Sequence, residues 1–119
     1  MRKPTVTRFW MYGLIGLMLG LLLQSPQSLA DDRQKRIGKQ LYENHCAVCH
    51  GRRGKGDGYT RLNPPPADLS SSSVVDKSDL QLIRIIHEGR PNTAMGAWKW
   101  VLSEEETKDV LAYVRTFSR

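Results

Sequence analysis

The stretch that decides the fold of this chain is Cys46-Ala47-Val48-Cys49-His50. It holds the only two cysteines in 119 residues, and a histidine directly follows the second one. Two thiols at this spacing lie on one short turn, where both can add to the vinyl groups of a haem while the adjacent imidazole reaches the iron. The spacing therefore favours covalent attachment of one haem c, with His50 as an iron ligand.

Three other kinds of site use the same residue types. A thioredoxin-like dithiol needs a βαβ setting, which this helical, glycine-rich neighbourhood does not supply. A zinc site built from His45 and the pentapeptide lacks the usual second pair of ligands further along the chain. A disulfide across two intervening residues is sterically awkward and leaves His50 without a role. Haem attachment is the leading interpretation, and these three are its alternatives.

The first 30 residues have the layout of a secretory signal peptide. Basic residues at positions 2, 3 and 8 come before an apolar run from Phe9 to Leu23, and a small-residue pattern ends at Ala30. The run is shorter than the roughly 20 residues that span a membrane comfortably. We therefore predict a signal peptide over residues 1–30 that is cleaved on export to the periplasm. An uncleaved membrane anchor is the alternative.

Residues 31–119 are enough for one small domain. Without the leader, 15 Lys and Arg face 12 Asp and Glu, so the formal charge falls from +6 to +3. No basic stripe with interleaved aromatic residues occurs, which argues against nucleic acid as a partner and leaves membrane contact to an uncleaved leader. Glycine and proline crowd the middle of this short segment. A core of side chains alone would therefore be marginal, and a large buried cofactor would stabilise it.

Apolar residues recur at helical spacing without strand alternation, so an all-α domain is expected. We predict three main helices, over residues 31–45, 78–88 and 103–117. The second and third begin with a capping box, in which a serine and a Gln or Glu three residues later satisfy each other's backbone N–H groups. The two pairs are Ser78 with Gln81, and Ser103 with Glu106.

The first of these helices has Asp31 or Asp32 as a candidate amino cap. It also carries Gly38 on its apolar face. This glycine either marks the close approach of another backbone or ring or is merely tolerated there. Residues 51–73, which follow the helix and the pentapeptide, are rich in Gly, Pro and Ser and predict a long loop. Wrapping around a prosthetic group would order such a loop.

Three residues are candidates for the second axial ligand of the iron: Met95, His87 and His45. Met95 stands in an irregular segment between two helices, from which its flexible thioether can reach across a haem face. His87 sits near the carboxyl end of a helix, where its charged form already meets a favourable dipole. His45 precedes Cys46 on the proximal side and is not expected to reach the far face. Met95 is therefore predicted as the distal ligand, opposite His50.

Further stretches surround the pentapeptide in a familiar order: Gly38-Lys39-Gln40-Leu41-Tyr42, Gly54-Lys55-Gly56-Asp57-Gly58, Asn63-Pro64-Pro65-Pro66-Ala67-Asp68-Leu69 and the segment from Gly89 to Met95. Together they resemble the class I monohaem cytochrome c family, in particular its small bacterial periplasmic members. The resemblance covers nearly all of residues 37–117. It implies an all-α fold of about three main helices, with long loops wrapped around one covalent haem over residues 31–119.

The resemblance also implies how the ends of the domain meet. In this family the amino and carboxyl helices cross, which here places Gly38 and Tyr42 against Tyr113 and favours close packing at the glycine. Two positions depart from the family pattern. Gly96 replaces the usual proline after the distal methionine, which predicts a looser distal loop. Tyr59 replaces a proline whose carbonyl receives the second nitrogen of the proximal histidine, and the Tyr59 carbonyl remains available for this bond.

These observations predict a periplasmic one-electron carrier, a monomer that exchanges electrons with redox protein donors and acceptors. Because both axial positions are filled, the iron has no open site, and enzymatic activity is not expected. The alternative is a dedicated or membrane-anchored haem subunit of a periplasmic oxidoreductase complex. In that case five basic residues would form a docking rim for an acidic partner: Arg52, Arg53, Lys55, Arg90 and Lys99.

Overall fold

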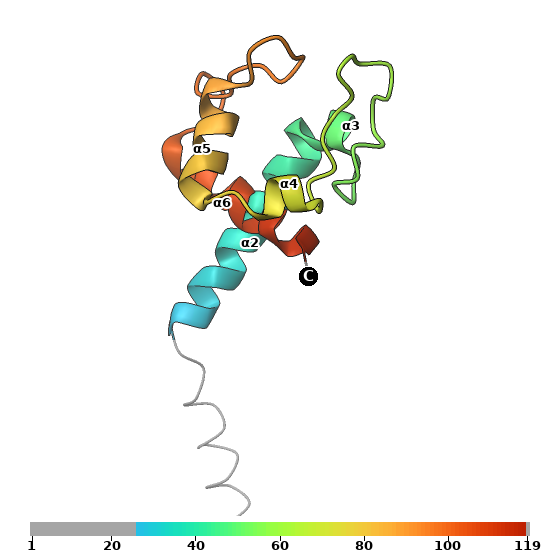
Figure 1. Cartoon of the computed structure of the whole chain (residues 1–119). Coiled ribbons are helices and arrows are strands. Elements are labelled where there is room, and N and C mark those ends of the chain that lie inside the picture. The colour runs from blue at the N-terminus through green and yellow to red at the C-terminus, as the bar shows by residue number, and fades with distance from the viewer. Residues whose placement is uncertain (1–25, 119) are drawn as a thin grey trace, which may run out of the picture. The chain divides into compact units, whose positions relative to one another are not determined.

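Figure 1 shows the computed structural model, which describes residues 26–118. The elements are α2 (Pro26–His45), α3 (Ala47–His50), α4 (Ser72–Val75), α5 (Asp79–Glu88), α6 (Glu104–Val114) and the 3-10 helix η1 (Arg115–Ser118). Residues 26–118 contain no strand, so the predicted all-α class is confirmed. The internal contacts divide the chain into two units, Met1–Asp31 and Asp32–Arg119, and the second holds the core and the cavity described below.

The apolar run of the predicted leader, residues 9–23, lies outside the described residues. Within residues 26–118, no helix is long and apolar enough to cross a membrane. The signal peptide over residues 1–30 and its alternative, an uncleaved anchor, both stay predictions.

The two predicted capping boxes are present. The Ser78 hydroxyl accepts a hydrogen bond from the Gln81 amide at 3.2 Å, and the Gln81 side chain accepts one from the Ser78 amide at 2.9 Å. Ser103 and Glu106 repeat this arrangement, at 3.2 Å and 2.8 Å. The bonds from Ser103 hold the pKa of the Glu106 carboxyl below its usual range. Both helices therefore begin where the sequence predicts, because the start signal is local.

Three boundaries differ from the prediction. Helix α2 is already helical at Pro26, the first described residue, so Asp31 and Asp32 lie inside it and neither caps it. Helix α6 ends at Val114, and the last predicted turn is the tighter helix η1. The predicted loop over residues 51–73 ends in the single turn α4.

The core lies where α2 meets α6. A Cβ atom built on Gly38 would lie 1.8 Å from the carbonyl oxygen of Asp109, so the two backbones are in direct contact. One turn later the fully buried Tyr42 ring meets Tyr113 edge-on, with 5.4 Å between centroids, and Phe117 at 5.2 Å. The predicted crossing is confirmed, and Gly38 is there for close approach.

Arg115 ties the carboxyl end of the chain to the segment between α4 and α5. Its guanidinium donates to the carbonyl oxygens of Val75 at 2.9 Å and Lys77 at 2.5 Å, and to the carboxylate of Asp79 at 2.7 Å. A planar fork with several donors suits such a set of acceptors. The segment held in this way forms one wall of the cavity described next.

Candidate haem-binding site

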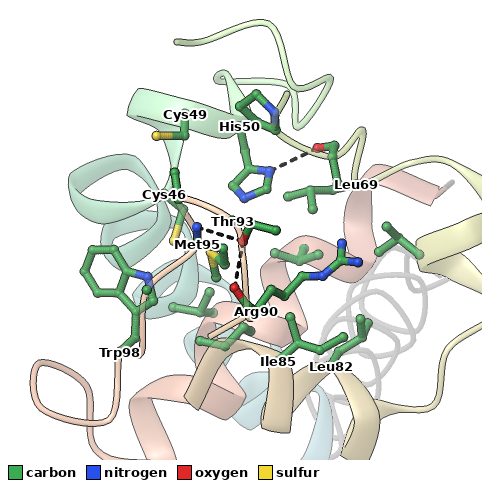
Figure 2. Close-up of a pocket in the computed structure, with 18 of the residues that line it drawn as sticks. Cys46, Cys49, His50, Leu69, Leu82, Ile85, Arg90, Thr93, Met95 and Trp98 are labelled. Carbon is green, nitrogen blue, oxygen red and sulfur yellow. Dashed lines mark hydrogen bonds between the residues drawn. The ribbon is translucent and has the colours of Figure 1, made fainter. Parts of the chain in front are cut away.

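A cavity of about 640 Å³ lies between the pentapeptide, α5 and the loops on either side of them. Cys46, Cys49, His50 and Met95 all line it, and in Figure 2 the first three lie on the pentapeptide turn and Met95 on a separate segment. The rest of the wall is mostly apolar and includes Pro64, Leu69, Leu82, Ile85, Val101 and Val110. Its volume falls within the roughly 300–1,000 Å³ of typical cofactor pockets. Thiols, imidazole and thioether around a large apolar space form a donor set that fits haem.

The pentapeptide forms one helical turn whose geometry is fixed by the core. The amide of His50 donates to the Cys46 carbonyl at 2.9 Å, and the amide of Gly51 closes the next bond, to Ala47, also at 2.9 Å. The buried Tyr42 hydroxyl then donates to the Gly51 carbonyl at 2.7 Å. Burial raises the pKa of this phenol, which keeps it protonated as a donor. The turn is thereby anchored to the helix crossing.

The His50 ring is oriented by a backbone carbonyl. Its Nδ1 atom lies 3.0 Å from the oxygen of Ala67, the bond drawn in Figure 2. The acceptor is therefore the Ala67 carbonyl and not the Tyr59 carbonyl, which the sequence had left available. The chain after the pentapeptide folds back tightly, and the Leu69 amide donates to the Gly54 carbonyl at 2.6 Å, which brings residues 66–69 over the imidazole. With Nδ1–H donating to a carbonyl, Nε2 keeps its lone pair for a metal.

Thr93 and Arg90 hold the backbone of Met95 in place through hydrogen bonds. The Met95 amide donates to the Thr93 hydroxyl at 3.1 Å, and that hydroxyl donates to the Arg90 carbonyl at 2.9 Å. The Arg90 amide donates in turn to the Met95 carbonyl at 2.8 Å. The Gly96 amide adds a bond to the Ala94 carbonyl at 3.0 Å, which a proline could not make. The loop is thus restrained by its own bonds, despite the missing proline.

The other candidate ligands are placed differently. His87 is not among the residues that line the cavity, whereas His45 lines it and packs against the Trp98 ring, with 5.5 Å between centroids. Trp98 borders the cavity, but Trp100 is 83% exposed. The structure therefore brings together all four predicted site residues and leaves out His87.

Sequence reasoning missed Ala67 and Thr93. Ala67 acts through its carbonyl, which no side-chain pattern reveals. Thr93 stands two residues before Met95, and this short spacing was the available signal for a hydrogen bond within the loop.

Two members of the predicted docking rim form ion pairs within the chain: Lys55 lies 3.6 Å from Asp68, and Lys99 lies 2.7 Å from Glu88.

The three alternative chemistries meet specific obstacles. Burial, with a further contribution from Cys49, raises the pKa of the Cys46 thiol to about 11, whereas a redox dithiol needs a lowered thiol pKa. Neither thiol is disulfide-bonded. Within residues 26–118, no three His, Cys, Asp or Glu side chains come together as a metal-binding cluster.

Known proteins are similar to this chain over nearly the whole predicted domain. Residues 36–118 match the sequence model of the family described as Cytochrome c. Cytochrome c55X of Paracoccus denitrificans is 31% identical over 103 residues, which cover 85% of this chain and 88% of that protein. Cytochrome c55X of Stutzerimonas stutzeri is 32% identical over 96 residues, covering 77% and 78% respectively.

A third relative is much longer. The dihydro-heme d1 dehydrogenase of Pseudomonas aeruginosa is 34% identical over 102 residues, which cover 85% of this chain but only 18% of that protein. This chain therefore spans less than a fifth of that relative. Taken with the cavity and its two cysteines, the match over residues 36–118 shows that the chain belongs to the cytochrome c family and is an electron carrier that binds haem c covalently through Cys46 and Cys49.

Proposed function

We propose that this protein is a periplasmic one-electron carrier in which His50 and Met95 are the two axial ligands of the haem iron. When bound, haem supplies a metal that cycles between its ferrous and ferric states. The observation that carries the proposal is that His50 and Met95 line the same cavity as Cys46 and Cys49, on segments far apart in the sequence.

The chain's own residues do three things for that chemistry. The Ala67 carbonyl orients the His50 imidazole, leaving Nε2 for the iron and raising its basicity. Thr93 and Arg90 hold the backbone of Met95, whose thioether favours the reduced state. When haem fills the cavity, the apolar wall excludes water from it. Two filled axial positions leave no coordination site for a substrate, which supports electron transfer over enzymatic catalysis.

Replacing Met95 by alanine is expected to abolish the weak far-red absorption band of the oxidised protein and to lower its reduction potential. The fall should be on the order of 0.1 V, well inside the roughly 0.8 V range over which axial ligands tune haem proteins. Absorption spectra and a redox titration measure both effects. The matched control is His87→Gln, which alters the histidine outside the cavity and should change neither. An unchanged band in Met95→Ala would rule out Met95 as the distal ligand.

Export is supported by the charged and apolar pattern of the leader and by the covalent haem. The intact mass of protein recovered from the periplasm is expected to equal that of residues 31–119 plus one haem. A mass that includes residues 1–30 would favour the uncleaved anchor. A mass without haem would contradict the covalent attachment.

A second candidate function is that of a dedicated redox partner of one oxidoreductase. It is favoured by the likeness between 85% of this chain and a small part of a much longer dehydrogenase. Size-exclusion chromatography of a native extract separates the two: a free carrier migrates as a small monomeric haem protein, and a dedicated subunit co-migrates with an enzyme.

A further inference from the structure

We propose that Arg90 binds a propionate of the haem, at the end of the cavity opposite the attachment cysteines. This inference rests on the haem occupying the cavity as proposed above.

The charge of the cavity wall is the first observation that supports it. Apart from His50, the ionisable nitrogen-bearing side chains that line the cavity are those of His45, Lys77 and Arg90. Among the described residues, none of those lining it is an Asp or a Glu. The wall is therefore suited to an anion.

The chemistry of haem says where its two carboxylates must lie. The vinyl-bearing pyrroles occupy one edge of the ring and the propionate-bearing pyrroles the opposite edge. Because Cys46 and Cys49 hold the vinyl edge, the propionates come to rest at the far end. In Figure 2 the Arg90 side chain runs across the cavity in the direction away from both cysteines.

A carboxylate at this far end needs a partner. Leu82 and Ile85 contribute apolar surface there, and an ionised carboxylate against such surface is unfavourable unless it is paired and hydrogen-bonded. A guanidinium presents two parallel N–H donors in the geometry that a carboxylate accepts. Arg90 supplies this fork from a wall that is otherwise mostly apolar.

Arg90 is better placed for this role than the other cations. The Lys77 ammonium donates to the carbonyl oxygen of Ser73. The guanidinium of Arg90, by contrast, makes no hydrogen bond or ion pair with any residue in the described range. The backbone of Arg90 is also fixed, since its amide and carbonyl both take part in the bonds around Met95. The backbone of Arg90 thus stabilises the Met95 loop, and its side chain remains available to bind the propionate.

The test is the Arg90→Gln variant of the haem-loaded protein. Removing a positive charge beside the haem favours the ferric state. At a fixed applied potential we therefore expect the ratio of reduced to oxidised protein to fall by roughly three- to tenfold, where tenfold corresponds to about 59 mV for a one-electron couple. The propionate methylene proton resonances of the reduced protein should shift as well. Arg90→Lys keeps the charge and should restore most of the potential.

The matched control is Arg84→Gln, which removes the same charge from an exposed position on α5 outside the cavity. It should leave the potential and the propionate resonances nearly unchanged. Equal effects in the Arg84 and Arg90 variants would overturn the inference, and so would a larger effect of Lys77→Gln. The far-red band reports separately on Met95. If that band is missing from the wild type, the axial assignment fails, and the propionate resonances still decide the Arg90 contact.

Discussion

Substituting Gly38 by alanine is expected to lower the free energy of unfolding by about 3 kcal/mol, at the upper end of the cost of overpacking a core. The added Cβ would lie 1.8 Å from the Asp109 oxygen, 2.5 Å from the Asp109 carbonyl carbon and 3.1 Å from the Val110 nitrogen. All three are backbone atoms, so no side-chain rotation relieves the clash. Helices α2 and α6 must move apart, which loosens the packing around Tyr42.

Denaturant unfolding of the haem-loaded protein measures this loss as a shift of the midpoint. Gln40→Ala is the control, because Gln40 is exposed on the same helix α2. We expect its midpoint to stay close to that of the wild type. Equal midpoints for the Gly38 and Gln40 variants would mean that the two helices do not touch as described.

The haem-free chain is expected to lose cooperative folding altogether. A cavity of about 640 Å³ left empty corresponds to roughly 15 kcal/mol at ~24 cal/mol per Å³, an upper figure because water enters an open cavity. That equals or exceeds the roughly 5–15 kcal/mol by which whole domains are stable. The Cys46→Ala/Cys49→Ala double variant, purified without haem, should show helical far-ultraviolet circular dichroism but no sharp thermal transition.

Val48→Ala provides the control in the same turn. Val48 is 68% exposed, so its truncation should leave haem attachment and the melting transition intact. Intact mass after denaturation reports the haem, and thermal melting followed by circular dichroism reports the fold. A haem-free double variant that melts as sharply as the wild type, at the same temperature, would show that the core is sufficient without the cofactor.

The parts of the fold that were predictable depend on local signals. Each capping box needs only a serine and a residue three positions later, so the starts of α5 and α6 follow from the sequence. The Gly38 crossing was predictable through the family resemblance, because a glycine alone does not say what approaches it. The expected cap at Asp31 or Asp32 was wrong because residues 26–30 are already helical, which the apolar spacing after Asp32 does not reveal.

The residues of the haem site likewise include some that the sequence predicted and some that it could not. Haem attachment through Cys46 and Cys49 was predicted from their spacing and is confirmed, whereas iron ligation by His50 and Met95 stays a prediction. The Ala67 carbonyl was not predictable, since any residue offers a carbonyl and only the folded loop selects one. The direction of the Arg90 side chain is likewise a property of the loop after α5, because its charge alone had suggested a surface role.

The hydroxyl of Tyr42 has a consequence for how the molecule opens. Its ring belongs to the packing between α2 and α6, and its hydroxyl donates to the carbonyl of Gly51, next to His50. Fluctuations that separate the two helices must therefore also release the attachment turn, and local unfolding of one without the other is suppressed. Helices α2 and α6 and the haem-bearing turn therefore form one cooperative unit.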